Sequence, residues 1–535
     1  MTGRKTPEVD AVVIGAGFAG LYAVHLIREH GFSLRGFEAG EGVGGTWYWN
    51  RYPGARCDVE SLEYQYRFTP ELVREWTWSE RYATQPEILS YAEWVADRLD
   101  VRKEFSFGEP IVRAVWDEEN HLWTVDTASG TSVTARFIVA GSGSISAPQL
   151  PDYEGVTEYR GEVYHTGRWP AENPDFSGKR VGVMGVGSSG VQVIPELAKV
   201  AEELVVFQRT PAYTLPARNR PLYADEIQYA RRFHDEIMER ADASYSGHNA
   251  MLPGHLLTEL GEQERTVLME RNWKLGGNLF ISAFPDIRHD PEANRIMSDF
   301  VRGKLHQIVE DPETARKLTP TTYPIGTKRI ITDTDYWATY NQPHVHLVNL
   351  PEEPILRFTP DGIQTAEHTY ELDALVMATG YDNLTGALTR IDLRGRGGET
   401  LKDSWADGVH TYLGIATAGF PNLFMLTGPQ SPSVIVNMFP AIEQHVDWTV
   451  ATMSRMRADG HTLIEADPGH EHWWFDQVEE EFNKTLYPRA NSWYSGANVP
   501  GKKRQAMMYM GGLHRYRELC NEVLDDDLRG FRLEA

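Results

Sequence analysis

The stretch YRGEVYHTGRWPAENPDFSGKRVGVMGVGSSG, residues 159 to 190, ends in an apolar run that leads into a glycine loop. The run is Val181–Met184, and the loop is GVGSSG, Gly185–Gly190. A strand that enters GxGxxG and continues as a helix is typical of dinucleotide binding, because the glycines allow a tight turn and close approach to a pyrophosphate. The same pattern occurs earlier, where residues 11–14 lead into GAGFAG, Gly15–Gly20. Two such units, about a domain's length apart, predict two bound nucleotides and electron transfer between them.

The second strands of the two units end in opposite charges. Leu34–Phe37 is followed by Glu38, and an acidic residue there accepts hydrogen bonds from a ribose hydroxyl. Leu204–Phe207 is followed by Gln208, Arg209 and Thr210, a cation and a hydroxyl that suit a 2′-phosphate. The sequence therefore predicts FAD in the first unit and NADPH in the second. The alternatives are a solvated strand end for Glu38 and a surface position for Arg209.

Composition limits the classes of partner. The net charge of -24 argues against nucleic acid and against an anionic membrane surface, which both require basic patches. The two cysteines, Cys57 and Cys520, form no CxxC motif, and no Cys/His cluster predicts a metal site. No apolar run has the length of a membrane span or the form of a signal peptide. We expect a reduced, cytoplasmic protein without an obligate protein partner.

The first half of the opening stretch carries a second, more specific motif. It reads Tyr-x-Gly-x-x-x-His-Thr-x-x-Trp and resembles the fingerprint of the type I Baeyer–Villiger monooxygenases, which usually begin it with Phe. Another family signature, Gly-x-Trp followed by Tyr-Pro-Gly-x-x-x-Asp, occurs between Gly45 and Asp58. The alternative for the fingerprint is a linker with a buried His and Trp. Its residues are Tyr159, Gly161, His165, Thr166 and Trp169.

The resemblance covers nearly the whole chain and implies its organisation. The fold is expected to be α/β, with two Rossmann-like domains for FAD and NADPH and a helical insertion in the NADPH domain. We expect the FAD domain at 1–147 and 381–535, the NADPH domain at 148–221 and 326–380, and the insertion at 222–325. The length of Gly428–Met438 resembles the phenylacetone and steroid monooxygenase branch.

The resemblance also implies the reaction. NADPH reduces FAD, O2 adds to flavin C4a, and the resulting peroxide converts a cyclic, aromatic or otherwise bulky ketone to an ester or lactone. Arg329 and Asp58 are the implied catalytic residues: Arg329 stabilises the anionic peroxide, and Asp58 pairs with Arg329. Without the resemblance, Lys328 and Arg329 form a solvated turn, and Asp58 caps a helix.

The remaining expected site residues bind the cofactors, and Trp493 belongs to a mobile control loop. The full expected set is Gly15, Gly17, Phe18, Gly20, Glu38, Gly45, Thr46, Trp47, Arg56, Cys57, Asp58, Tyr64, Ile111, Gly185, Gly187, Ser188, Ser189, Gly190, Gln192, Arg209, Thr210, Lys328, Arg329, Met438 and Trp493.

Two other functions stay open at this point. An N- or S-oxygenating flavin monooxygenase has a similar signature, but it usually lacks the closing Trp and has less need of a cation such as Arg329. A flavin-bearing redox sensor would oxidise NADPH slowly and give no oxygenated product.

Overall fold

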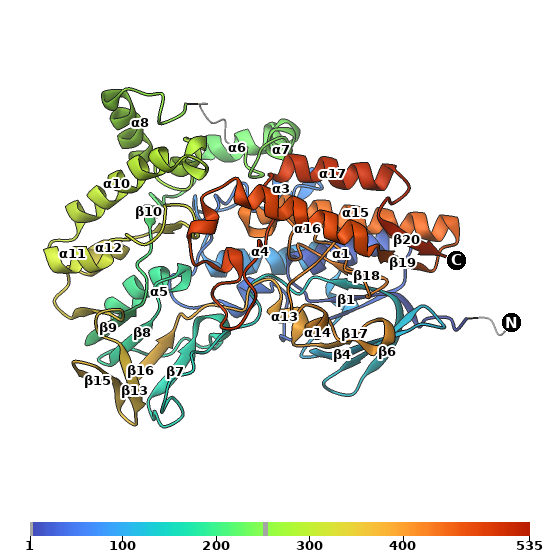
Figure 1. The fold of residues 1–535 in the computed structure, drawn as a ribbon, viewed down its shortest axis with the longest axis horizontal. Coiled ribbons are helices and arrows are strands. Elements are labelled where there is room, and N and C mark those ends of the chain that lie inside the picture. The colour runs from blue at the N-terminus through green and yellow to red at the C-terminus, as the bar shows by residue number, and fades with distance from the viewer. Residues whose placement is uncertain (1–3, 250–254) are drawn as a thin grey trace.

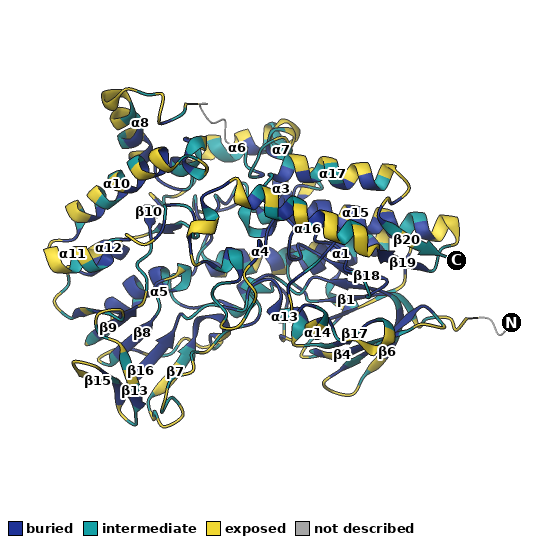
Figure 2. Cartoon of the chain, in the orientation of Figure 1, coloured by how far each residue is buried: buried dark blue, intermediate teal, exposed yellow. Residues whose placement is uncertain are grey.

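The chain forms two lobes, each built on a sheet with helices packed against it (Figure 1). The structure, a computed structural model, describes residues 4–249 and 255–535. One lobe contains the larger sheet and both ends of the described chain, and the other contains a smaller parallel sheet. The central strands of both sheets are buried, whereas the outer helices alternate buried and exposed residues (Figure 2).

The larger sheet has β1 (Val9–Ile14) at its centre, between β2 (Leu34–Phe37) and β6 (Ser132–Ala140). All three run parallel, and Ala11 pairs with Leu34 and Phe137. Their apolar side chains are buried on both faces, as a central parallel sheet requires. The order is β17-β4-β5-β6-β1-β2-β3, with β18 also paired to β6; the outer strands are β4 (Ile111–Asp117), β5 (Leu122–Thr127), β17 (Asp392–Arg394) and β18 (Leu423–Met425).

The run 105–114 is divided into two strands. Its first part, β3 (Phe105–Ser106), pairs parallel with β2, and only β4 joins the antiparallel layer with β5. Gly108 lies between them with φ +66°, and Pro110 follows. A left-handed glycine and a residue without an N–H end the first strand, because neither continues a ladder.

The smaller sheet is entirely parallel. Its order is β12-β9-β8-β16-β7, formed by β12 (Val345–Asn349), β9 (Glu203–Gln208), β8 (Arg180–Met184), β16 (Ala374–Met377) and β7 (Glu162–His165). Beside it lies a small antiparallel sheet of β13 (Ile355–Thr359), β14 (Gly362–Thr365) and β15 (Thr369–Glu371). Parallel strands present their carboxyl ends at one edge, where ligands bind in folds of this kind.

A mostly helical segment lies between β10 (Thr214–Pro216) and β11 (Ile331–Asp333), which pair with each other. Two of its helices begin with Asp-Pro: Asp290 and Asp311 accept hydrogen bonds from the first-turn backbone N–H groups of α10 and α11. The helices are α6 (Ala224–Arg232), α7 (His234–Asp242), α8 (Glu262–Leu275), α9 (Leu279–Ser282), α10 (Pro291–Ile308) and α11 (Pro312–Leu318).

The last third of the chain returns to the larger lobe. There α15 (Met438–Asp459) packs against α1 (Phe18–Glu29) and α17 (Leu513–Asp525), beside α16 (Pro468–Asn483) and the two-stranded antiparallel sheet of β19 (Leu463–Ala466) and β20 (Phe531–Glu534). None of the helices in residues 4–249 and 255–535 is both long and apolar enough to cross a membrane. The domain limits given above remain a prediction.

Candidate active site

The first glycine loop joins β1 to α1 and lies beside the end of β2. Gly15 has φ +93°, and a Cβ on Gly20 would come within 1.8 Å of the Gly15 carbonyl oxygen, so the turn requires glycine at both positions. Glu38, only 6% exposed, accepts hydrogen bonds from the N–H groups of Ala16 and Gly40, both at 2.7 Å. Burial raises the pKa of Glu38, and the two hydrogen bonds oppose that rise. The carboxylate keeps further acceptor sites for a ribose hydroxyl.

The predicted flavin-lining segment packs directly on this loop. Gly45 lies against Gly17, and α2 (Thr46–Trp49) follows it. The indole of Trp47 donates to the hydroxyl of Tyr64 at 3.1 Å. Cys57 is buried, and burial raises the pKa of its thiol, so it behaves as a small apolar group and not as a nucleophile.

The second glycine loop repeats the first between β8 and α5 (Ser188–Ala198). Gly187 has open space around it, with no atom within 4 Å of where its Cβ would be. One turn into α5, Gln192 joins the two lobes. Its amide donates to the Arg56 carbonyl at 2.9 Å and accepts from the Tyr52 hydroxyl at 2.8 Å. Two residues that the sequence assigns to cofactor binding, Gln192 and Arg56, thus contact each other.

Arg209 and Lys328 come together after β9 and before β11. Lys328 lies 4.8 Å from the centre of the Tyr323 ring, and both burial and the charge of Arg209 lower the pKa of Lys328. Within the described residues neither cation has an ion-pair partner, and Thr210 follows Arg209 in sequence. Two converging cations without a carboxylate form a site for an anion.

Arg329 and Asp58 form the ion pair that the sequence predicts. Arg329 Nε donates to Asp58 Oδ2 at 3.0 Å and Nη2 to Oδ1 at 2.5 Å, while Nη1 donates to the Val434 carbonyl at 3.2 Å. The side chain of Asp58 is 10% exposed and that of Arg329 is 31% exposed, so the guanidinium is the member of the pair that faces open space. Asp58 raises the pKa of Arg329, which keeps it charged.

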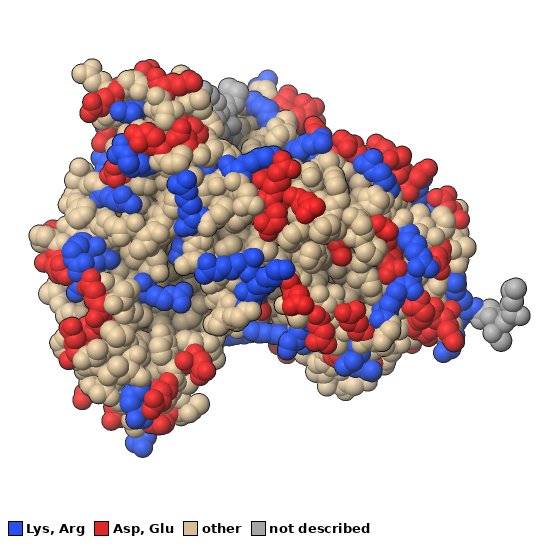
Figure 3. All heavy atoms as spheres, viewed as in Figure 1, with Lys and Arg blue, Asp and Glu red and all other residues tan. Residues whose placement is uncertain are grey.

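That open space is a cavity of about 870 Å³, including its part open to solvent. Its wall combines segments that lie far apart in the sequence: the region after Asp58, the helical segment, the turn before Arg329, and two stretches of the last third. In the space-filling view, Lys and Arg side chains gather around the hollow between the lobes (Figure 3).

Several cavity residues carry no signal in the sequence. Tyr494 lies next to the expected Trp493, yet Tyr494 lines the cavity, and Trp493 is half-buried against the core of the larger lobe. By contrast, Val434, Ile435 and Val436 belong to a segment that the resemblance already singles out, Gly428–Met438, and they line the cavity, whereas Met438, the first residue of α15, does not. The others that sequence reasoning missed are Val59, Ser246, His248, Asn278, Ile281, Ser282, Ile287, Arg288 and Tyr487.

The fingerprint lies at the junction of the lobes and outside the cavity wall. It forms β7, the edge strand of the smaller sheet, and the short turn after it. His165 Nδ1 accepts from the Gly167 N–H at 2.9 Å, and Nε2 lies 3.3 Å from the Thr379 hydroxyl. The backbone N–H of Trp169 donates to the Trp49 carbonyl, which connects the fingerprint to the predicted flavin loop.

The rest of the fingerprint is structural in the same way. The Tyr159 hydroxyl donates to the Leu372 carbonyl, and Thr166 is fully buried. A Cβ on Gly161 would collide with the Tyr159 ring. Of the remaining expected cofactor residues, Phe18 packs against Tyr64 and Phe439, and Ile111 is buried at the start of β4.

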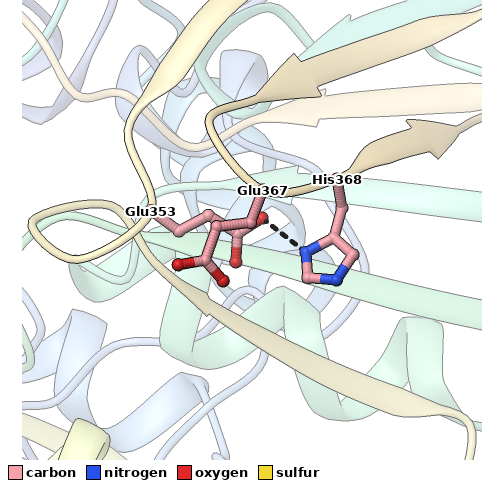
Figure 4. Close-up of side chains that lie close together, drawn as sticks. All are labelled: Glu353, Glu367 and His368. Carbon is pink, nitrogen blue, oxygen red and sulfur yellow. Dashed lines mark hydrogen bonds and ion pairs between the residues drawn. The ribbon is translucent and has the colours of Figure 1, made fainter.

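One group of metal-ligand type occurs among the described residues, on the turns beside the smaller sheet: Glu353, Glu367 and His368 (Figure 4). Glu353 pairs with His368 Nδ1 at 3.1 Å and accepts from the hydroxyls of Thr365 and Tyr370. These bonds hold β14 and β15 to the turn after β12. The group lies on a different part of the fold from the cavity.

The residues present fit two dinucleotides. Both glycine loops precede helices whose first N–H groups are free for phosphate, and Gly187 leaves its surroundings open. Glu38 suits an unphosphorylated ribose, and Arg209 with Lys328 suits a phosphorylated one.

The comparisons agree with this geometry. The family described as flavin-binding monooxygenase-like matches residues 9–251. A Baeyer–Villiger monooxygenase of Pseudooceanicola batsensis is 41% identical over 97% of this chain and 95% of its own length. A phenazine N-monooxygenase of Lysobacter antibioticus is 41% identical over 100% of this chain and 99% of its own. The structure of oxidized steroid monooxygenase bound to NADP is 46% identical, with a TM-score of 0.93 over 98% of this chain and 99% of that one.

Fold and site together define a two-nucleotide flavin-binding monooxygenase. The chain belongs to the Baeyer–Villiger monooxygenases, which use FAD and NADPH. The family, the α/β fold and the cofactors predicted from the sequence are confirmed.

Proposed function

We propose that this enzyme converts cyclic, aromatic or otherwise bulky ketones to esters or lactones in the cavity beside Arg329, with NADPH and O2 as co-substrates. The observation that carries the proposal is the bidentate Asp58–Arg329 pair, whose guanidinium faces the cavity. The branch-like length of Gly428–Met438 and the 46% identity to steroid monooxygenase support the bulky class. A cytoplasmic location, suggested by two free buried cysteines, is part of the same proposal.

Bound FAD supplies electron transfer from NADPH and the activation of O2. The first unit holds it through the Gly15–Gly20 loop and Glu38, and the second holds NADPH through the Gly185–Gly190 loop, Arg209, Thr210 and Lys328. The protein must then stabilise an anionic oxygen species in a partly enclosed site, where an unpaired anion is costly. Arg329 provides a cation that stays charged at every working pH.

Asp58 acts by positioning. Its two oxygens fix the guanidinium from one side, and the Val434 carbonyl fixes it from another, so the outward face of Arg329 has a single orientation. Preorganised charge of this kind stabilises developing anions without reorganisation during the reaction. Tyr487 and Tyr494, both part of the cavity wall, narrow the access of water to the cation.

A second candidate is oxygenation at nitrogen or sulfur, which the similarity to a phenazine N-monooxygenase favours. One experiment separates the two. The purified enzyme is given NADPH, O2 and one of benzylacetone, acetone or thioanisole, and products are identified by mass spectrometry. Ester from the ketone supports the proposal, and sulfoxide without any ester supports the rival. NADPH oxidation without either product would indicate a redox sensor, and turnover of acetone alone would contradict the bulky class.

A further inference from the structure

The cavity contains a second cation that the reaction does not require. Arg288, the last residue of the short helix η3 (Pro285–Arg288), lines the same cavity as Arg329. Within the described residues its guanidinium has no ion-pair partner, whereas Arg329 is held by Asp58, and His248, also in the wall, pairs with Glu63. Arg288 is thus the unpaired charge of this wall.

The position of Arg288 is fixed by its surroundings. The guanidinium carbon lies 4.4 Å from the centre of the Tyr245 ring, and the Tyr245 hydroxyl donates to the Met510 carbonyl at 2.6 Å. The backbone carbonyl of Arg288 accepts from the Leu486 N–H at 2.8 Å. A guanidinium that stacks on an anchored ring keeps its N–H groups directed sideways, available to a ligand.

Arg288 and Arg329 approach the same region of the cavity. Burial raises the pKa of Tyr487, and the charges of both arginines oppose that rise, so both arginines lie near Tyr487. The wall around them also contains apolar side chains, those of Ile281, Ile287 and Val434–Val436. A molecule in this cavity therefore meets the reaction cation, several apolar side chains and a second, free cation.

We propose that Arg288 selects ketones that carry a carboxylate on an apolar body, so that the enzyme prefers keto acids to neutral ketones of the same size. The proposal rests on the proposed function, because it takes the cavity of Arg329 as the oxygenation site. A charge-assisted, bidentate contact to a carboxylate is the interaction that a free guanidinium forms best.

The test compares benzylacetone with a para-carboxylate against its methyl ester, by the rate of ester or lactone-type product formation at saturating NADPH. The unaltered enzyme should have the higher kcat/KM for the carboxylate. Arg288→Gln should lower that value roughly 10- to 100-fold, mainly through KM, since one charge-assisted contact has about this effect. The methyl ester should change by less than about threefold. Arg271→Gln, at an exposed position of α8, is the matched control and should change neither value.

Charge reversal makes the test independent of protein stability. Arg288→Glu should reverse the order and favour benzylacetone with a para-aminomethyl group over the carboxylate. An unchanged ratio of carboxylate to methyl ester in Arg288→Gln would overturn the proposal, as would a KM increase for NADPH alone, which would assign Arg288 to the cofactor. Failure of the unaltered enzyme to oxygenate either ketone would instead contradict the proposed function.

Discussion

The two glycine loops have nearly the same backbone and differ in how their charges are satisfied. Gly15 and Gly185 have φ values of +93° and +102°, and each lies against the carbonyl of a neighbouring strand end, Gly141 or Ala378. In the first unit the buried carboxylate of Glu38 already accepts two backbone hydrogen bonds. In the second unit Arg209 and Lys328 converge without a counter-charge among the described residues.

This difference indicates that the two nucleotides remain bound for different lengths of time. In the first site, the charge of Glu38 is already balanced by backbone N–H groups of the protein. Such a site suits a cofactor that stays bound. The second becomes electrostatically complete only when a phosphate arrives, and it suits a co-substrate that binds and leaves in each turnover. The following changes are ordered from the largest expected effect to the smallest.

Arg329→Ala should have the largest effect, because it removes the cation that stabilises the anionic oxygen species. A guanidinium about 4 Å from an anion contributes roughly 4 kcal/mol at an effective dielectric of ~20, equivalent to about a thousandfold in rate. Ester yield should fall by that order, while FAD binding and NADPH oxidation persist. Product yield per NADPH consumed measures this.

Arg329→Lys is the control, since it keeps the charge without the bidentate geometry and should retain part of the yield. Because removing Arg329 leaves Asp58 buried and unpaired, thermal unfolding of both variants should accompany the assay. Near-normal yield in Arg329→Ala would support the solvated-turn interpretation of Lys328 and Arg329.

Two single substitutions, Arg209→Gln and Lys328→Gln, test the cations of the second unit. Each charge-assisted bond to a phosphate contributes about 1.5–3 kcal/mol, so KM for NADPH should rise roughly 10- to 100-fold per substitution. KM for NADH should change little. Equal KM values for both coenzymes in the unaltered enzyme would contradict the assignment of the second unit to NADPH.

A pH profile sharpens the same prediction. The pKa of Lys328 is lowered by burial and by Arg209, so its charge is lost at a lower pH than that of an ordinary lysine. KM for NADPH should therefore begin to rise, as pH increases, before the ordinary lysine pKa of about 10.4 is reached. Removing Arg209 should move that rise to higher pH, whereas KM for NADH should show no such step.

Glu38→Ala tests the buried carboxylate of the first unit. It leaves the buried N–H groups of Ala16 and Gly40 without an acceptor, at about 1–3 kcal/mol each. FAD should dissociate more readily, with affinity lowered roughly 10- to 100-fold, and the flavin released on dilution measures the loss. Glu41→Ala, an exposed position on the same loop, should retain its flavin.

Gln192→Ala should have the smallest effect. It removes two neutral hydrogen bonds between the lobes, each with a net contribution of about 1 kcal/mol. We expect KM for NADPH and product yield to change only a few-fold. Tyr52→Phe removes one of the same bonds and should give about half of that change in free energy.

Local patterns were enough to predict the glycine loops, β1, β2 and β9 within two residues, because strand, turn and charge lie next to each other in sequence. The pairing of Asp58 with Arg329 was predicted only through the resemblance, since 271 positions separate them. The cavity wall could not be predicted, because it depends on which face of a turn points inward. Tyr494 and Trp493 illustrate this: adjacent aromatic residues are indistinguishable by composition, and only packing assigns one of them to the cavity.

The contact of Gln192 with Arg56 and Tyr52 has a thermodynamic consequence. Gln192 lies on the helix that follows the second glycine loop, and its partners lie on the predicted flavin loop. If a nucleotide bound at one site strengthens this contact, it changes the binding free energy at the other site, and the second nucleotide changes binding at the first by an equal amount. NADP should then tighten the binding of FAD by the same factor by which FAD tightens the binding of NADP. The enzyme would keep its flavin best in cells where its reductant is plentiful.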